Sequence, residues 1–231
     1  FALQRWFTGS IFRGAVRIFS IKVEQTGEPG EGPVLVMMRH ASTADTVIAG
    51  ALVATEQGPR LRYVLKRELL WDPCLDIVGR RLPNVFADRS GSRSDAEIAA
   101  VRNLAQGLSA RDGVLIYPEG TRRAPGDVPN YKFGIAHLYT NLNLPVIPIA
   151  HVAGLYWPRR KFLRYPGVIK CRVLPPIQPG LSAEEFLDEL KRVTEAACDE
   201  FLVEAATGPN PPHLPETARR RLAELGVKLP G

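Results

Sequence analysis

The sequence is poor in cysteine and lacks long uncharged apolar runs. Its three cysteines, Cys74, Cys171 and Cys198, are odd in number and show no CxxC spacing, so we expect reduced thiols and no metal site. No stretch approaches 18 uninterrupted apolar residues, which excludes a membrane-spanning helix within this chain. The GxSxG and HExxH signatures are also missing, so neither a serine-hydrolase nor a zinc-peptidase site is indicated.

Acidic residues are fewer than basic ones, 24 against 30, so the net charge is +6. Such a balance favours an anionic partner, whether nucleic acid, an anionic lipid surface or a phosphorylated substrate. The basic residues form short clusters between apolar segments, without a recognition helix, a zinc finger or an RNP-like aromatic motif. We therefore rank nucleic acid last and expect no nucleic-acid partner.

The length of 231 residues and a 45% hydrophobic content predict one domain with a substantial core. Short apolar runs alternate with segments of helical length, which predicts an α/β fold with a mixed, mostly parallel sheet flanked by helices. The expected strands are 34–38, 62–66, 84–87, 114–117, 146–150 and 168–174. The expected helices are 43–57, 68–82, 94–109, 132–141 and 182–206, the last with a capping box formed by Ser182 and Glu185.

The N-terminal segment has a helical period of apolar residues, with Arg13 and Arg17 on the opposite face. The apolar positions are Leu3, Phe7, Ile11, Ala15 and Ile18. Two interpretations stay open: a helix packed on its own domain, or an amphipathic helix lying in a membrane interface. The first residue is Phe1 rather than Met, so we expect the numbering to begin inside a longer polypeptide.

Three polar motifs follow expected strands. In "MRHASTAD", His40 and Asp45 lie five positions apart after the run 34–38, a spacing that chance alone often produces. In "YPEGTR", residues 117–122 combine a carboxylate, a flexible glycine, a hydroxyl and a guanidinium that suits phosphate oxygens. In "VFADRSGSRS", residues 85–94 fit either a phosphate cradle or a salt-bridged turn.

The order of these motifs resembles that of the glycerolipid acyltransferases, the PlsC-type 1-acylglycerol-3-phosphate acyltransferase family. The first block of that family is His-x4-Asp, which His40 and Asp45 match here. Its second block is a Phe-x-Asp-Arg-like segment, which Phe86, Asp88 and Arg89 match.

The third and fourth blocks are also present. The third is Pro-Glu-Gly-Thr-Arg, matched by Pro118 to Arg122, and the fourth is an apolar strand with two prolines, matched by Pro145 and Pro148. The resemblance runs from about residue 32 to about residue 205. We therefore expect an amphipathic N-terminal helix at 1–26, an acyltransferase catalytic domain at 27–206 and a C-terminal tail at 207–231.

The resemblance implies roles for individual residues. His40 would act as general base and Asp45 would orient its ring, as the aspartate does in hydrolase triads. The glycerol-phosphate end of the acceptor would be bound by Arg89, Glu119, Gly120, Thr121, Arg122 and Lys132. Since Glu119 cannot hold phosphate itself, it would orient an arginine or bind a glycerol hydroxyl.

Other polar residues receive weaker interpretations. The family often has Asn or Lys before the histidine, and here Arg39 would either lower the pKa of His40 or hold a phosphate. His137, His151 and His213 are interpreted as structural or solvated, with His151 the least secure because strand ends in α/β folds often face the site.

The implied reaction moves a fatty acyl group from acyl-CoA or acyl carrier protein to lysophosphatidic acid, without a cofactor. Glycerol-3-phosphate or a lyso-aminolipid as acceptor, a lipid or thioester hydrolase, and a non-catalytic lipid-binding relative are the alternatives. We expect the protein on an anionic membrane surface, peripheral or monotopic, on the cytoplasmic side. The contacts would come from the first helix together with Trp157, Arg159, Arg160, Lys161 and Arg164, unless that basic segment is a solvated loop.

Overall fold

The computed structural model describes residues 2–30, 32–42, 44–49, 60–66, 84–87 and 94–229. Within these ranges, seven strands form one sheet in the order β1-β7-β6-β2-β5-β3-β4. The strands are β1 (Ile21–Thr26), β2 (Val34–Met38), β3 (Arg60–Lys66), β4 (Val85–Ala87), β5 (Asp112–Ile116), β6 (Val146–His151) and β7 (Gly167–Val173). The β6–β7 pair is antiparallel and the other pairs are parallel, which confirms the predicted mixed, mostly parallel sheet.

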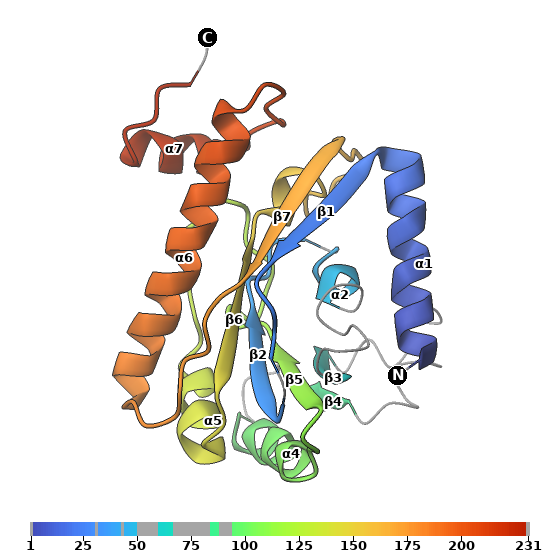
Figure 1. Cartoon of the computed structure of the whole chain (residues 1–231). Helices are drawn as coiled ribbons and strands as arrows, with labels where there is room; N and C mark the ends of the chain where they lie inside the picture. Colours follow the sequence, from blue (N-terminus) through green and yellow to red (C-terminus); the bar gives the residue numbers. More distant parts are fainter. Residues whose placement is uncertain are drawn as a thin grey trace.

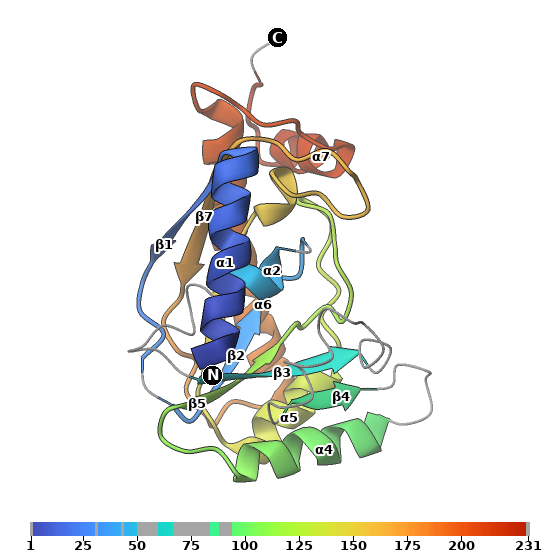
Figure 2. The same cartoon turned by 90° about the vertical axis from the view of Figure 1, so that its right-hand side faces the viewer.

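Helices cover both faces of this sheet (Figure 1). They are α1 (Ala2–Phe19), α2 (Asp45–Ile48), α4 (Ser94–Gln106), α5 (Gly134–Leu142), α6 (Ala183–Thr207) and α7 (Glu216–Glu224), with a 3-10 turn, η3 (Ala153–Leu155). The helices α5 and α6 lie on one side of the sheet and α1 and α2 on the other, as both views show (Figures 1 and 2). No described helix is long and apolar enough to cross a membrane.

The central strand β2 supplies side chains to two separate parts of the core. Val34, Val36 and Met38 belong to one apolar cluster, while Leu35 and Met37 belong to another that includes residues of α4, α5 and α6. Because successive side chains of a strand point to opposite faces, an uninterrupted apolar run fits a strand covered on both faces. All five residues of β2 are buried, as this pattern requires.

Most expected elements are present, with small shifts at their ends. The capping box of Ser182 and Glu185 is confirmed at the start of α6. Of the two expected helices at 43–57 and 68–82, α2 represents the first, and nearly all the rest of both lies outside the described residues.

Two differences concern the chain ends. The N-terminal helix stops at Phe19, and Ile21–Thr26, which we grouped with it, form an edge strand paired with β7. The tail contains α7, whose Ala218 and Leu222 are fully buried against the core. Strand β1 and helix α7 are therefore parts of the domain.

Candidate active site

The site lies where the central strands end. Strands β5, β2 and β6 are parallel neighbours, with Met37 beside both Ile116 and Pro148. Their carboxyl ends therefore reach the same edge of the sheet, the usual position of a ligand site in an open α/β fold. His40 follows β2, Glu119 follows β5, and His151 is the last residue of β6.

The predicted His40 and Asp45 pair is formed. His40 Nδ1 lies 2.8 Å from Asp45 Oδ2, and the same oxygen accepts the backbone N–H groups of Ala41 (2.8 Å) and Ser42 (2.9 Å). Asp45 begins α2 and is fully buried, whereas the His40 side chain is 19% exposed. The aspartate thus engages Nδ1, and Nε2 is the ring nitrogen left for a substrate.

The imidazole of His40 has a fixed plane. It stacks on the ring of Tyr117, with the ring centroids 4.1 Å apart and the planes 20° apart. Tyr117 OH lies 3.4 Å from Thr46 Oγ1 in α2. Burial, together with the nearby charge of Asp45, raises the pKa of Tyr117 well above its ordinary value, so this ring is a neutral support for the histidine.

The backbone of His40 is held by the loop after β5. Its N–H donates to both carboxylate oxygens of Glu119 (3.1 and 3.2 Å), and its carbonyl accepts the N–H of Arg123 (2.7 Å). Glu119 is fully buried, so its carboxylate faces the protein rather than a solvent-filled pocket. Of the two roles that the sequence left open for Glu119, orienting an arginine fits this geometry.

Arg39 is that arginine. Its Nε lies 2.9 Å from Glu119 Oε1, its Nη1 contacts Glu195 of α6, and its Nη2 donates to the carbonyl of Asp127 (3.3 Å). Burial opposes the charge on Arg39, but Glu195 and Glu119 outweigh this effect and raise its pKa above the ordinary value. Burial in turn raises the pKa of Glu119 to about 7. Arg39 therefore stabilises the fold around His40 and is not placed to hold a phosphate.

His151 is buried beside the His40–Asp45 pair. Its Nδ1 accepts the N–H of Ala153 (3.2 Å), which fixes the tautomer in which Nε2–H donates to the carbonyl of Arg39 (2.7 Å). Burial lowers the pKa of His151 and favours this neutral form. Nε2 also lies 3.7 Å from Asp45 Oδ1, an oxygen without another partner among the described residues. These contacts fit the interpretation of His151 as a structural residue. Its ring contacts both the backbone of Arg39 and the carboxylate of Asp45.

The other predicted substrate-binding residues lie around the same loop. Gly120 has a positive φ of 67°, which lets the chain turn after Glu119, and a Cβ there would lie 3.7 Å from the side chain of Lys132. Thr121 and Arg122 line a cavity beside Ala41, and Lys132 is exposed. Arg89 lies outside the described residues.

Sequence reasoning missed several residues of the site. Glu195 and Tyr131, whose OH donates to Glu195 (2.9 Å), complete the buried network around Arg39. The one usable signal was the position of Arg39, because an arginine directly after a fully apolar strand requires an acidic partner when buried. Nothing in the sequence indicated that the partner lies 156 residues away.

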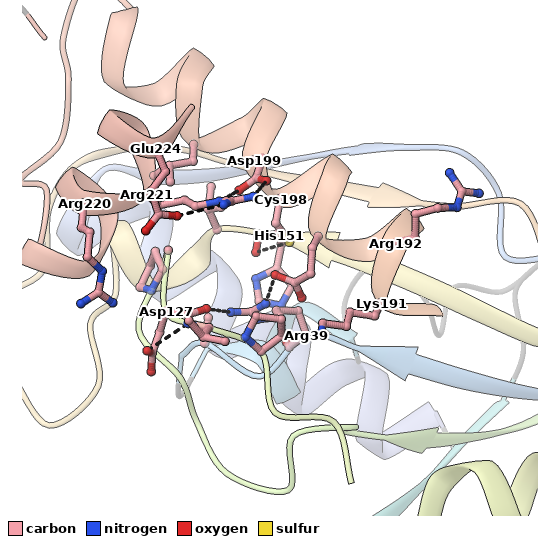
Figure 3. A pocket seen from close by; sticks show the side chains of 18 of the residues that line it. Arg39, Asp127, His151, Lys191, Arg192, Cys198, Asp199, Arg220, Arg221 and Glu224 are labelled. Atoms are coloured by element: carbon pink, nitrogen blue, oxygen red, sulfur yellow. Dashed lines mark hydrogen bonds and ion pairs between the residues drawn. The ribbon is translucent and has the colours of Figure 1, made fainter. Parts of the chain in front are cut away.

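A second cavity, of about 420 Å³, lies between α6, α7 and the loop 123–129 (Figure 3). Arg39, Ala41 and His151 form its floor, so it adjoins the site from the side of the buried network. Burial raises the pKa of Cys198, which lines it, to about 12, so this thiol is a poor nucleophile. Among the described residues, no group of three or more His, Cys, Asp and Glu side chains could hold a metal ion.

Comparisons with known proteins agree with this geometry. A family model described as Acyltransferase matches residues 20–152, more than half of the chain. The chain belongs to the acyltransferase family. This acyltransferase is 32% identical over 210 residues to the 1-acyl-sn-glycerol-3-phosphate acyltransferase of Pseudomonas aeruginosa, a match that covers 88% of this chain and 77% of the relative.

Mammalian relatives are more distant. The acyltransferase is 29% identical to the 1-acyl-sn-glycerol-3-phosphate acyltransferase alpha of Mus musculus and to that of Homo sapiens, over 73% of this chain and 59% of each relative. Its fold resembles the crystal structure of the 1-acyl-sn-glycerophosphate acyltransferase PlsC from Thermotoga maritima. That likeness has a TM-score of 0.69 at 21% identity and covers 86% of this chain and 78% of the other.

Proposed function

We propose that the protein transfers a fatty acyl group from an acyl thioester to the free hydroxyl of lysophosphatidic acid, which yields phosphatidic acid. The observation that carries this proposal is the His40–Asp45 pair at the edge of the sheet, with Nδ1 engaged at 2.8 Å and the ring still partly exposed. The relatives named 1-acyl-sn-glycerol-3-phosphate acyltransferases support the choice of acceptor.

His40 would act first as a base and then as an acid. Its Nε2 takes the proton of the acceptor hydroxyl as the oxygen attacks the thioester carbonyl, and the C–O bond forms as the carbonyl becomes an oxyanion. When the oxyanion collapses, the C–S bond breaks, and the departing thiolate receives the proton from Nε2. Asp45 keeps the proton on Nδ1 throughout and stabilises the imidazolium between the two steps.

The donor is acyl-CoA or acyl carrier protein, since each presents the same thioester to the same base. The reaction needs no cofactor, because proton transfer and positioning account for each bond made and broken. Both lipid substrate and product reside in a bilayer, so the enzyme would work as a peripheral or monotopic protein at an anionic membrane surface on the cytoplasmic side.

The test is acyl transfer by the purified chain carrying His40→Ala. A general base contributes roughly 10²–10⁴-fold in rate, so kcat with lysophosphatidic acid should fall by that factor while the unfolding transition stays in place. His137→Ala is the matched control, because His137 is an exposed histidine of α5 whose ring contacts Phe133 rather than the pair, and its loss should leave kcat unchanged.

Unchanged turnover by a folded His40→Ala variant would end the proposal. A panel of lysophosphatidic acid, glycerol-3-phosphate and a lyso-aminolipid, each with acyl-CoA and with acyl carrier protein, identifies the acceptor and the donor. Release of free fatty acid without any acceptor would instead identify a thioester hydrolase.

A further inference from the structure

The cavity that contains Thr121 and Arg122 extends well beyond the four sequence blocks. It measures about 520 Å³ and begins at Ala41, the residue after His40. The rest of its wall comes from the loop after β5, from the loop after η3 and from the C-terminal tail. Outside the blocks, its lining includes Arg123, Asp127, Arg159, Lys161, Tyr165 and His213. We call this the loop cavity.

The loop cavity has an excess of positive charge. Of the described residues that line it, Arg122, Arg123, Arg159 and Lys161 are cationic, and Asp127 is the single carboxylate. The neighbouring cavity in Figure 3 differs, because its five cationic residues face five acidic ones, and Arg221 there pairs with both Asp199 and Glu224. An anionic ligand is therefore favoured in the loop cavity and not in its neighbour.

Arg159 is held in place without a carboxylate partner in the described chain. Its Nη1 donates to the carbonyl of Arg122 (2.7 Å), and its buried Nε has no partner. Burial, and then repulsion from Arg160, Arg122 and Arg123, lowers the pKa of Arg159. Bringing these guanidinium groups together costs free energy that a bound anion would recover, and a guanidinium is well suited to grip two oxygens of one phosphate.

The segment 158–163 divides its side chains between two environments. Arg159 and Lys161 line the loop cavity, whereas Arg160, which has a left-handed backbone (φ 56°), does not. Directly after them, the side chain of Phe162 is 97% exposed and that of Leu163 is 64% exposed. A cationic cavity next to exposed apolar side chains suits an amphiphile with a phosphate headgroup.

We propose that Arg159 and Lys161, with Arg123, bind the phosphate monoester of the acyl acceptor alongside Arg122, the one member of this set that the sequence blocks already imply. The loop after η3 would then select phosphorylated lysolipids over neutral ones, a role separate from membrane docking. This inference rests on the proposed function, because it assigns the headgroup site of that same reaction. Stacking of His213 on Tyr165, with centroids 5.5 Å apart, connects the tail to the same wall.

The experiment compares Arg159→Gln and Lys161→Gln with Arg160→Gln, which removes the same charge from the same loop outside the cavity. With saturating acyl-CoA, the KM for lysophosphatidic acid should rise roughly ten- to hundredfold in the first two variants, the effect of losing one charge-assisted hydrogen bond. The control should keep its KM, and turnover of a monoacylglycerol, which has no phosphate, should be equal in all forms. Arg159→Lys should recover only part of the loss, because a lysine cannot donate in a fork.

Three results would overturn the inference: an unchanged KM for lysophosphatidic acid, an equal rise in Arg160→Gln, or a rise in the KM for acyl-CoA alone. The last would assign the cavity to the phosphates of the donor. Calorimetric titration of the wild-type chain with glycerol 3-phosphate, with glycerol as the blank, tests the site without turnover. If lysophosphatidic acid is not acylated, the proposed function fails, while loss of glycerol 3-phosphate binding in Arg159→Gln still reports on the cavity.

Discussion

Arg39 shares its charge between the buried carboxylate of Glu119 and the partly exposed carboxylate of Glu195. One cation cannot neutralise both acids, and burial raises the pKa of Glu119 to about 7. Since the carboxylate of Glu119 also accepts the N–H of His40, the charge state of this network is connected to the position of the base. We therefore regard Arg39 as a positioning residue for His40.

Replacing Arg39 by glutamine should destabilise the fold. The change leaves the buried carboxylate of Glu119 and the partly exposed one of Glu195 without this cation, and breaking the buried Arg39–Glu119 pair should lower the free energy of unfolding by about 3–5 kcal/mol. In addition, kcat should fall while the KM for lysophosphatidic acid stays near its original value, because Arg39 holds the base rather than the substrate. Urea denaturation and steady-state kinetics measure the two effects.

Arg192→Gln is the matched control, since Arg192 pairs with Glu189 on the exposed surface of α6. Exposed pairs contribute about 0–1 kcal/mol, so this variant should unfold near the wild-type urea concentration. A rise in the KM for lysophosphatidic acid with unchanged stability in Arg39→Gln would contradict the positioning role and favour direct phosphate binding.

Local sequence predicted the contact between His40 and Asp45 but not the surroundings of this pair. His40 and Asp45 are five residues apart at the start of a helix, so the spacing of the two residues nearly determines their contact. Glu195, with its partner Tyr131, reaches Arg39 only after the sheet has placed α6 against β6, the neighbour of β2, and no local pattern encodes that approach. For the same reason, the sequence could not show that Arg159 lines the loop cavity and that Arg160 does not.

At the scale of elements, α7 holds the loop 123–129, which lines both cavities, in place. Thr217 Oγ1 donates to the carbonyl of Pro125 (2.7 Å), and Gly126 next to it has a φ of 76°. A Cβ on Gly126 would lie 2.6 Å from the carbonyl oxygen of Thr217, which leaves no room for a side chain. The tail thus supports the loop whose Arg123 holds the carbonyl of His40.

Gly126→Ala should therefore be costly in both stability and activity. Gly226→Ala is the matched control, because Gly226 has a similar φ of 73° with no atom within 4 Å of an added Cβ. An alanine held in the left-handed backbone region costs roughly 1–2 kcal/mol, and the control measures this strain alone. Gly126→Ala should lower the free energy of unfolding by clearly more than the control does, as measured by urea denaturation. Equal losses in the two variants would show that the contact between α7 and the loop does not contribute to the free energy of unfolding.

Elements with long apolar runs were predictable, and edge elements were not. "VLVMM" becomes β2 because a strand buried on both faces needs apolar residues throughout. "IKVEQT" alternates and lies at the edge of the sheet, so nothing in it required a strand, and β1 was grouped with the preceding helix. Its pairing with β7 depends on residues far along the chain.

At the scale of the whole molecule, exposed apolar side chains occur on two neighbouring segments. The Trp6 and Ile18 side chains of α1 are 64% and 73% exposed, and Phe162 and Leu163 are exposed in the loop after η3. Phe19 contacts Trp157 edge to face at 5.7 Å, which joins the end of α1 to the start of that loop. Figure 2 places α7 and the end of α1 at the same end of the molecule.

We expect this end to bind anionic bilayers. Replacing Phe162 and Leu163 by serine should reduce binding to vesicles that contain an anionic phospholipid, because about 1.5–3 kcal/mol per large apolar side chain is lost when it no longer enters the lipid. Raising the salt concentration should weaken the remaining binding, since the net charge of +6 is screened. Vesicle flotation measures both effects.

Phe133→Ser provides the control for flotation, because Phe133 is an exposed phenylalanine at the start of α5, far along the chain from both segments. Equal losses from Phe133→Ser and from the Phe162 and Leu163 double variant would refute a localised docking surface. Unchanged flotation of the double variant would refute it as well.

The parallel pairing of β1 with β7 sets an order of events during synthesis. Ile21 pairs with Gly167, so the first strand has no partner until about 150 further residues have been made. At about 5–20 residues per second, that delay is on the order of ten seconds. During it, α1 has left the ribosome with its apolar side chains uncovered and no sheet to pack on. We therefore expect a nearby bilayer to compete with the unfinished domain for that helix, so that the proposed membrane docking would begin during biosynthesis.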